Sequence, residues 1–187
     1  MKSYNIIENY RDDAFLRNSF FDFIQKVFPG LNFQEWFSKG YWRDEYIPFS
    51  IVENDMIVAN VSITKMKIFL DRKLIDGIQF GTVGTIPEYR NRGLSRYLMD
   101  YVLDKYGNSA DLFFLFANES VVDFYPRFGF TKCDEIVFKA ESDIPKSRYS
   151  ARQLDIRSKT DIAIIEDLLK HRLPLTKLFG ALEYDFI

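Results

Sequence analysis

The length and composition of the chain are those of a globular protein with about one domain. Its 187 residues can bury about 70% of the surface that the unfolded chain exposes, so neither a disulfide nor a metal is needed to hold a core. Hydrophobic residues make up 47% and charged residues 28%, which excludes a disordered or collagen-like chain. The 25 Lys and Arg nearly balance the 27 Asp and Glu. This balance argues against nucleic acid as a partner, because binding it needs a basic surplus on one face.

The counts of Cys, His and aromatic residues indicate which kinds of site the chain can form. A single Cys excludes an internal disulfide framework, and a single His argues against a His-based metal site or a Ser-His-Asp triad, so we expect no metal. Aromatic residues reach 17%, and they either fill a core or line a wide apolar cleft. The chain shows no secretory signal and no run of 18 apolar residues. We therefore expect a cytoplasmic protein without a membrane partner.

Two helices are predicted near the start of the chain. The first follows Asp12 and Asp13 and ends at Pro29–Gly30. Its apolar face is formed by Leu16, Phe20, Phe23, Ile24 and Val27. The Phe residues between positions 15 and 28 are expected to be core, although their position before the sheet also suits one wall of an acceptor cleft. Asn32 and Glu35 have the spacing of a capping box and predict a short second helix that ends at Gly40.

Three strands with antiparallel character follow these helices. They cover Ile47–Val52, Met56–Phe69 and Ile78–Thr85. Turn residues separate them at Asn54–Asp55 and at Asp71–Lys73. Strands joined by such short turns are expected to form hairpins.

The next segment alternates between helices and strands. Pro87 closes the third strand, and a helix runs from Leu94 to Tyr106. The run Leu112–Phe116 is short and apolar, as expected of a strand covered on both faces. A short helix is expected over Glu119–Phe128 and a strand over Phe130–Lys139, in which Cys133 would be a small buried hydrophobe. Strand-helix-strand crossings imply parallel pairing, so the fold class is α/β with a mixed sheet, and ligands are expected at the carboxyl ends of its strands.

The C-terminal part is expected to form an extension of strand, helix and strand. Residues 1–140 form the main domain, 141–150 a polar linker and 151–187 the extension. Its elements are a strand over Arg152–Arg157, a helix capped near Thr160–Asp161 and closed by His171, and a strand over Leu182–Ile187. The extension is too short for a core of its own. It packs on the first domain, pairs with a second copy to give a homodimer through its last strand, or begins a second module.

The segment Phe80–Met99 carries the strongest chemical signal. It is a strand, a basic turn with glycine, and a helix that begins at the turn. The first turn of a helix offers free backbone N–H groups and a positive dipole end, which suit an anion. Gly93 allows close approach of the backbone to a phosphate, and Arg90, Arg92 and Arg96 add positive charge. The alternative is an ordinary strand-to-helix loop with surface arginines.

Three motifs in this part of the chain resemble those of the GCN5-related N-acetyltransferases (GNAT). Arg90, Gly93 and Ser95 fill the places of the acyl-CoA signature Arg/Gln-x-x-Gly-x-Gly/Ala, with Ser in place of Gly or Ala. Asn118 precedes Tyr125 by seven residues, and the segment from Phe124 to Phe130 resembles the Tyr-x-x-x-Gly-Phe element of the family. The resemblance covers about residues 1–140. Within the family the chain most resembles the enhanced-intracellular-survival subgroup, and residues 151–187 would then begin a second, incomplete module.

The resemblance implies a GNAT fold, acetyl-CoA as cosubstrate and a set of site residues. The backbone of Val83, Gly84 and Thr85 would pair with the pantetheine arm, and one of its N–H groups would polarise the thioester. Asn118 would contact the arm, and Tyr125 would protonate the leaving thiolate. The pyrophosphate would be held by backbone N–H groups of Asn91, Arg92, Gly93, Leu94, Ser95 and Arg96.

The implied reaction transfers the acetyl group directly to a primary amine of a small molecule or peptide. The amine must first lose a proton. The place where some relatives carry a Glu base is Phe113, and Asp44 and Glu45 are alternative groups to attract the amine, although a solvated loop is the more ordinary interpretation of both. The missing base leaves a second function open, namely a non-catalytic acyl-CoA-binding module with a role in regulation or assembly.

Overall fold

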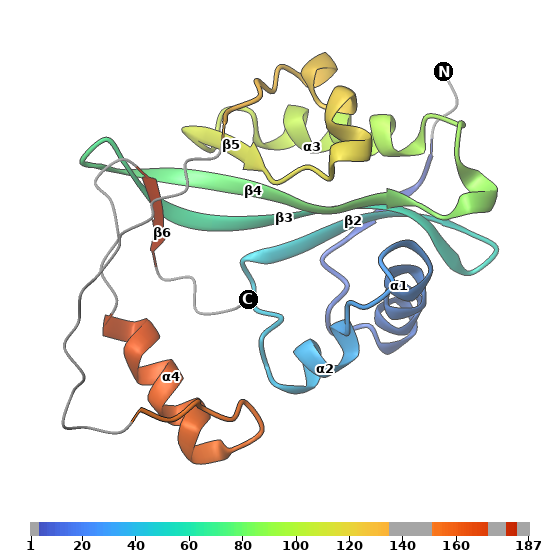
Figure 1. Cartoon of the computed structure of the whole chain (residues 1–187). Helices are drawn as coiled ribbons and strands as arrows, with labels where there is room; N and C mark the ends of the chain where they lie inside the picture. Colours follow the sequence, from blue (N-terminus) through green and yellow to red (C-terminus); the bar gives the residue numbers. More distant parts are fainter. Residues whose placement is uncertain (1–3, 135–150, 172–178, 183–187) are drawn as a thin grey trace.

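The structure is a computed structural model that describes residues 4–134, 151–171 and 179–182. A twisted sheet forms the middle of the molecule, with α1 (Ala14–Val27) and α2 (Phe33–Ser38) on one face and α3 (Leu94–Tyr106) on the other (Figure 1). This arrangement confirms the predicted mixed α/β fold.

The sheet has six strands, five of which follow the order β1-β2-β3-β4-β5. Their bounds are β1 Ile6–Glu8, β2 Tyr46–Glu53, β3 Met56–Leu70, β4 Lys73–Thr85, β5 Leu112–Leu115 and β6 Phe179–Leu182. Among the described strands, β4 and β5 alone pair in parallel, as the strand-helix-strand crossing predicts. The strand β1 was not predicted, because its three residues form a strand only through their antiparallel pairing with β2.

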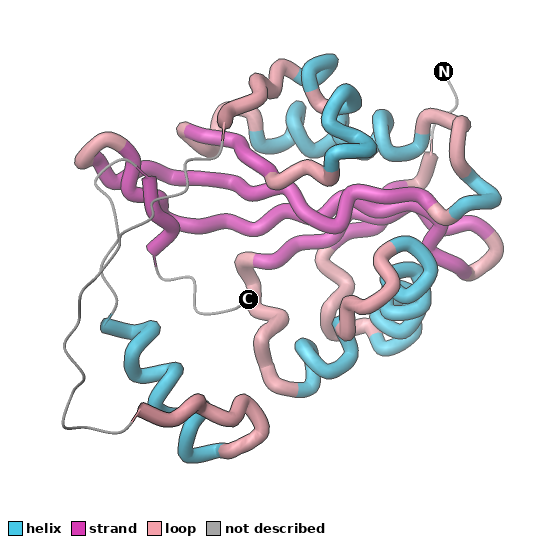
Figure 2. Tube along the Cα trace, viewed as in Figure 1, coloured by secondary structure: helices cyan, strands magenta, loops and turns pink. Residues whose placement is uncertain are grey.

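The two hairpins form at the predicted turns and give the sheet its long central arms (Figure 2). Asn54 and Asp55 have φ of 50° and 60°, and Asp71 and Arg72 have φ of 44° and 64°. Two successive residues with positive φ are typical of the two-residue turns that match the twist of β-hairpins, and Asn and Asp tolerate this conformation well.

Local capping explains where α1 and α2 begin. The Asp13 carboxylate accepts hydrogen bonds from the N–H groups of Phe15 and Leu16, and the Asn32 side chain accepts from the N–H of Glu35. Of the predicted apolar face of α1, Phe20, Phe23 and Ile24 are buried. Phe20 and Phe23 therefore pack into the core, as expected, whereas Phe15 at the start of the helix is 60% exposed.

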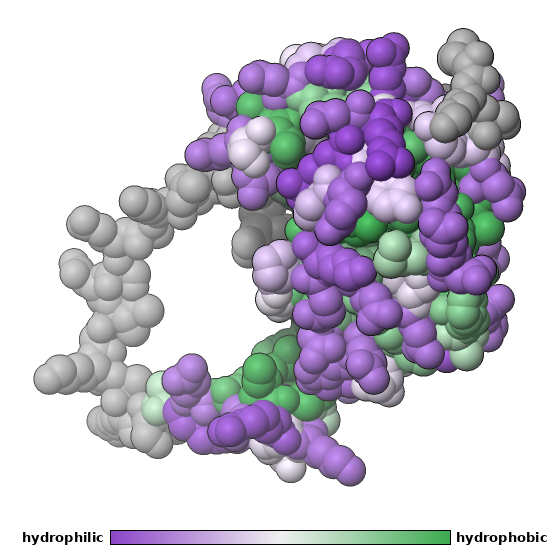
Figure 3. All heavy atoms as spheres, turned by 90° about the vertical axis from the view of Figure 1, so that its right-hand side faces the viewer, coloured by the Kyte–Doolittle hydropathy of each residue, from purple (hydrophilic) through white to green (hydrophobic). Residues whose placement is uncertain are grey.

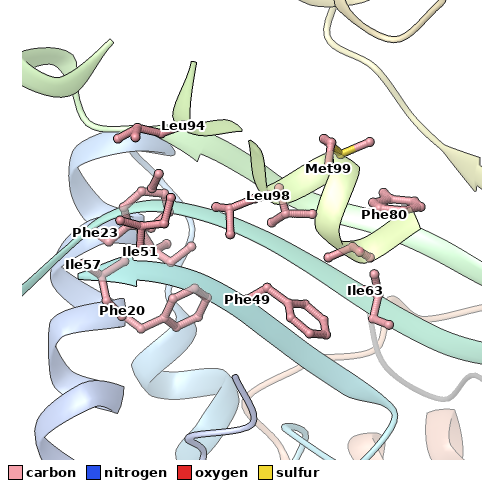
Figure 4. Packing of buried hydrophobic residues seen from close by; sticks show 14 of the residues in the cluster. Phe20, Phe23, Phe49, Ile51, Ile57, Ile63, Phe80, Leu94, Leu98 and Met99 are labelled. Carbon is pink, nitrogen blue, oxygen red and sulfur yellow. The ribbon is translucent and has the colours of Figure 1, made fainter. Parts of the chain in front are cut away.

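The second half of the core lies between the sheet and α3. This helix buries Leu94, Leu98, Met99 and Val102, three of which are labelled in Figure 4 together with buried side chains of the sheet and of α1. Helices from both layers therefore contact β3 and β4, and β5 lies at an edge of the sheet.

Three expectations for residues 112–134 are wrong in the described part. Residues of β5 are half-buried and Phe116 is 79% exposed, because β5 is an edge strand. The predicted helix over Glu119–Phe128 is instead two 3₁₀ segments, η2 (Glu119–Phe124) and η3 (Pro126–Phe128), divided where Pro126 lacks an N–H donor. Residues 130–134 form a loop in which Cys133 is exposed. Residues 135–139 and the linker 141–150 lie outside the described residues.

The C-terminal extension differs in part from the prediction. Arg152–Arg157 is a loop with a turn, not a strand, because its polar groups bond within the segment and to Asp161. The helix α4 (Lys159–His171) is confirmed, and Nδ1 of His171 lies 2.9 Å from the carbonyl oxygen of Asp167 in its last turn.

The strand β6 pairs antiparallel with β3 from Lys67 to Leu70, beyond the part of β3 that pairs with β2. This part of the extension therefore packs on the main sheet of the same chain. Residues 183–187 lie outside the described residues, and the pairing with a second copy stays a prediction.

Candidate acyl-CoA site

The strand β4 has one open edge at its carboxyl end. Its pairing with β3 continues to Thr85, opposite Ala59, whereas its pairing with β5 ends at Phe80, opposite Leu115. Residues 81–85 are half-buried, and within the described part of the chain no strand pairs with them on the β5 side. An extended acyl-carrying arm can add to such an edge as another strand would.

A β-bulge lies within this open stretch. Ser62 pairs with Gly81 and Asn60 with Gly84, so two residues of β4, Thr82 and Val83, lie opposite one residue of β3. Thr82 has a φ of 45°, which is rare for a β-branched residue. The extra residue changes which side of the strand the following N–H and C=O groups face.

The bulge decides which amides face the open edge. Before it, the Asp76 carbonyl oxygen accepts from the N–H of Asp111 at 2.8 Å, so even-numbered residues face β5. After it, the N–H of Ile86 donates to the Val58 carbonyl oxygen at 3.0 Å, so even-numbered residues face β3. Backbone groups alternate along a strand, and the amides of Val83 and Thr85 therefore face the open edge.

Gly84 is fixed by the close approach of α1. A Cβ at this position would lie 2.6 Å from Cγ1 of Val27 and 3.2 Å from Cζ of Phe28. The end of α1 thus packs directly on the bulged part of β4, which leaves no room for a side chain.

The loop before α3 has the geometry of an anion site. Asn91 and Gly93 have φ of 62° and 76°, which folds the backbone tightly into the helix. The helix α3 begins at Gly93 without a side-chain cap, in contrast to α1 and α2. Because no side chain of the described residues caps this end, the first N–H groups of α3 and the positive end of its dipole are available to a phosphate. The face with the end of β4 and the start of α3 carries mainly hydrophilic residues (Figure 3).

Ser95 links this loop to the open strand. Its Oγ lies 2.8 Å from Oγ1 of Thr85 in a hydrogen bond between the two hydroxyls. Although Ser95 is larger than the Gly or Ala of the signature, its side chain is therefore bonded to Thr85 and does not project freely into the loop. It joins the start of α3 to the end of β4.

The three arginines of the motif have different partners. Arg90 donates from Nε to the Thr85 carbonyl oxygen at 3.3 Å. The guanidinium of Arg92 lies 4.4 Å from the ring centroid of Tyr89, and that of Arg96 lies 3.7 Å from the Asp100 carboxylate. No carboxylate among the described residues pairs with Arg90 or Arg92, whereas Asp100 compensates part of the Arg96 charge.

Asn118 and Tyr125 lie at the two ends of η2. The Asn118 side chain caps η2 by accepting from the N–H of Ser120 at 3.1 Å. Tyr125 is only 8% exposed and packs between the rings of Phe124 and Phe130. Burial raises the pKa of the Tyr125 phenol above its ordinary value of 10.0. Its hydroxyl makes no hydrogen bond to the residues that the structure describes.

The groups predicted to act on the amine are replaced by a ring, already paired, or exposed. Phe113 packs its ring against Phe80, with 5.9 Å between the centroids. Asp44 is 87% exposed and lies 2.6 Å from an Arg11 guanidinium nitrogen, so its charge is already paired, and Glu45 is an exposed loop residue. The solvated-loop interpretation is therefore the better one for Asp44.

Sequence reasoning missed the bulge at Thr82 and the polar residues behind it. The available signal was a set of short polar residues at alternate positions of strands that are otherwise apolar, namely Ser50, Asn60, Ser62 and Thr64. Among the described residues no group of three or more His, Cys, Asp or Glu side chains could hold a metal, and no described helix is long and apolar enough to span a membrane.

The sequence matches the model of the acetyltransferase (GNAT) domain over residues 13–133. The chain belongs to the GNAT acetyltransferase family. This match contains the loop before α3, Asn118 and Tyr125, so all three predicted motifs lie inside the family domain. It does not separate the enhanced-intracellular-survival subgroup from the rest of the family, and that narrower resemblance stays a prediction.

Solved structures confirm the GNAT fold. An aminoglycoside acetyltransferase from an uncultured soil metagenomic sample has a TM-score of 0.57 at 16% identity, covering 78% of this chain and 100% of its own. A predicted acetyltransferase from Clostridium acetobutylicum, solved with acetyl-CoA, has a TM-score of 0.56 at 16% identity over 74% and 96%. Glucosamine-6-phosphate N-acetyltransferase from Arabidopsis thaliana reaches 0.57 at 17% identity over 75% and 100%. No curated protein matches the chain.

Proposed function

We propose that this GNAT protein transfers the acetyl group of acetyl-CoA to a primary amine. The observation that carries the proposal is the open edge of β4 at residues 81–85 directly beside the uncapped start of α3. The open edge of β4 accepts an extended arm, and the start of α3 accepts a pyrophosphate. Coenzyme A contains both groups.

The backbone supplies most of the binding groups. The pantetheine arm pairs with the backbone of Val83 and with the amide of Thr85, whose carbonyl oxygen already accepts from Arg90, and the pyrophosphate takes the N–H groups of the segment Asn91–Arg96. Arg90 and Arg92 add charge attraction to the phosphates. Asn118, at the start of η2, contacts the arm.

The transfer needs no covalent enzyme intermediate. The neutral amine nitrogen attacks the carbonyl carbon of the thioester, and an N–H on the open edge of β4 stabilises the oxyanion that forms. When the intermediate collapses, the carbon–sulfur bond breaks and the thiolate takes a proton from Tyr125, which then recovers a proton from water. Burial raises the pKa of Tyr125, so the phenol carries its proton at neutral pH, as a proton donor must. A water chain carries away the amine proton, since Phe113 stands where some relatives have a Glu.

Two measurements on the full chain test the proposal. Calorimetry is expected to show binding of coenzyme A, weakened about tenfold in Arg90→Ala, because one charge-assisted contact to phosphate is lost. Arg157→Ala is the matched control, since Arg157 pairs with Asp155 in the C-terminal extension and is 88% exposed. Thiol release from acetyl-CoA is then measured with a panel of amines that includes amino sugars, because two of the similar structures are named for aminoglycosides and glucosamine-6-phosphate.

The same measurements separate this function from a second candidate. Phe113 at the base position favours a non-catalytic acyl-CoA-binding module. Binding of coenzyme A without thiol release for any amine would support that module. Thiol release that depends on an amine supports the transferase, and absence of binding contradicts both.

A further inference from the structure

We infer that a buried network around Asn60 positions the acetyl group, by holding the bulge of β4 in its strained conformation. This inference rests on the proposed function and concerns residues of β2, β3 and β4 that lie behind the open edge, outside the family motifs. Ser50, Asn60 and Ser62 are fully buried between the sheet and the α1–α2 layer. Burying polar groups costs free energy that only hydrogen bonds offset, and these side chains make such bonds with one another.

Thr82 is the point on which this network converges. Its hydroxyl donates to Oγ of Ser62 at 2.7 Å and lies 2.9 Å from the hydroxyl of Tyr46. Nδ2 of Asn60 donates to Oγ1 of Thr82 at 3.1 Å and to its carbonyl oxygen at 3.0 Å. Both the side chain and the backbone of Thr82 are therefore held.

The remaining bonds fix Asn60 itself. Oγ of Ser50 donates to Oδ1 of Asn60 at 2.7 Å, and the hydroxyl of Tyr10 lies 2.7 Å from Oγ of Ser50. With its amide oxygen occupied in this way, Asn60 is oriented so that its amide nitrogen points to Thr82. Among the described residues no buried side-chain nitrogen or oxygen lacks a partner, so the network is fully satisfied.

The network acts where the backbone is strained. A β-branched residue with φ of 45° relaxes toward negative φ unless its surroundings hold it. If Thr82 relaxed, the bulge would no longer change which backbone groups face β3 and which face the open edge. The amide of Val83 would then turn away from the open edge. The hydroxyl of Thr82 thus determines where the thioester carbonyl meets an N–H donor, although Thr82 itself is a positioning residue.

The test compares two variants at Thr82. Thr82→Val keeps the shape and the β-branch but removes the hydroxyl, and Thr82→Ser keeps the hydroxyl. Ser19→Ala is the stability control, because Oγ of Ser19 accepts from the N–H of Ile57 elsewhere on β3. The readout is the carbonyl stretch of bound acetyl-CoA labelled with ¹³C at the thioester carbon, measured by isotope-edited infrared spectroscopy, together with kcat, KM and the affinity for coenzyme A.

In the wild-type protein and in Thr82→Ser and Ser19→Ala, we expect the bound carbonyl stretch to lie below that of free acetyl-CoA. In Thr82→Val we expect it to return toward the free value and kcat to fall about 10- to 100-fold, with coenzyme A affinity within about threefold. Should Thr82→Val fail to fold, Tyr46→Phe removes one hydroxyl from the same cluster and is expected to act in the same direction.

An unchanged carbonyl stretch and kcat in a folded Thr82→Val or Tyr46→Phe would overturn this inference and leave the proposed function intact. A wild-type protein that does not bind acetyl-CoA would overturn the proposed function and this inference with it.

Discussion

At the scale of single residues, Tyr125 separates catalysis from binding. We expect Tyr125→Phe to lower kcat for thiol release about 100-fold or more, because the leaving thiolate loses its proton donor. The ring packing against Phe124 and Phe130 remains, so coenzyme A affinity and the melting temperature should stay close to the wild type. A kcat within threefold of the wild-type value would contradict the role of the phenol.

The ionisation of Tyr125 also predicts the pH profile. Burial raises the pKa of the phenol above 10.0, so the acid stays protonated over the whole neutral and mildly alkaline range. The amine has an ordinary pKa of about 10 and gains its reactive neutral form as the pH rises. We therefore expect kcat/KM to increase from about pH 6 to pH 9 without a falling limb. A decrease above pH 8 would mean that the proton donor has a lower pKa than Tyr125.

Gly84 offers a test of packing at the site. Gly84→Ala would place a Cβ 2.6 Å from Cγ1 of Val27, and we expect it to destabilise the fold by about 1–3 kcal/mol. Gly81→Ala is a matched control in the same strand, because a Cβ there meets nothing within 4 Å. The melting temperatures of the two variants are compared by thermal unfolding, and Gly84→Ala is expected to have the lower one. Equal melting temperatures would show that α1 does not lie against Gly84.

At the scale of elements, local signals were sufficient where the chain marks its own boundaries. Asp13 and Asn32 cap the predicted helices, and the turns at Asn54–Asp55 and Asp71–Lys73 form the predicted hairpins. The alternating pattern over Arg152–Arg157 wrongly predicted a strand, because a strand also needs a partner and no strand of the described residues pairs with this segment. The three-residue strand β1 was missed for the converse reason, since pairing with β2 creates it.

The start of α4 is expected to depend on one ion pair. Two nitrogens of Arg152 lie 2.6 and 2.7 Å from the carboxylate oxygens of the buried Asp161, and this contact, with the N–H of Asp155, lowers the pKa of Asp161 to about 2. A lowered pKa contributes stability that is present above the ordinary value near 4 and is lost as the pH falls through about 2.

We therefore expect Arg152→Gln to speed hydrogen exchange of the α4 amides at pH 5 to 7. Arg157→Gln is the control, because the Arg157 side chain is 88% exposed and does not contact Asp161. Equal exchange in the two variants would contradict an anchoring role for Arg152.

At the scale of the whole molecule, the candidate site combines short sequence motifs with a β-bulge that depends on the pairing of two strands. The loop Arg90–Ser95 and the pair Asn118 and Tyr125 were predicted, because short motifs carry them. The bulge at Thr82 was not, because a shift of one residue in register depends on how β4 pairs with β3, and no local pattern encodes it. The buried network around Asn60 was missed for the same reason.

Hydrogen exchange measured with and without coenzyme A tests the central claim most directly, namely that the open edge of β4 and the start of α3 form one binding site. We predict that saturating coenzyme A slows exchange in two segments, Val83–Thr85 and Asn91–Arg96, and leaves α4 unchanged. Exchange that is unaffected in both segments, or slowed only in the C-terminal extension, would contradict the site described above.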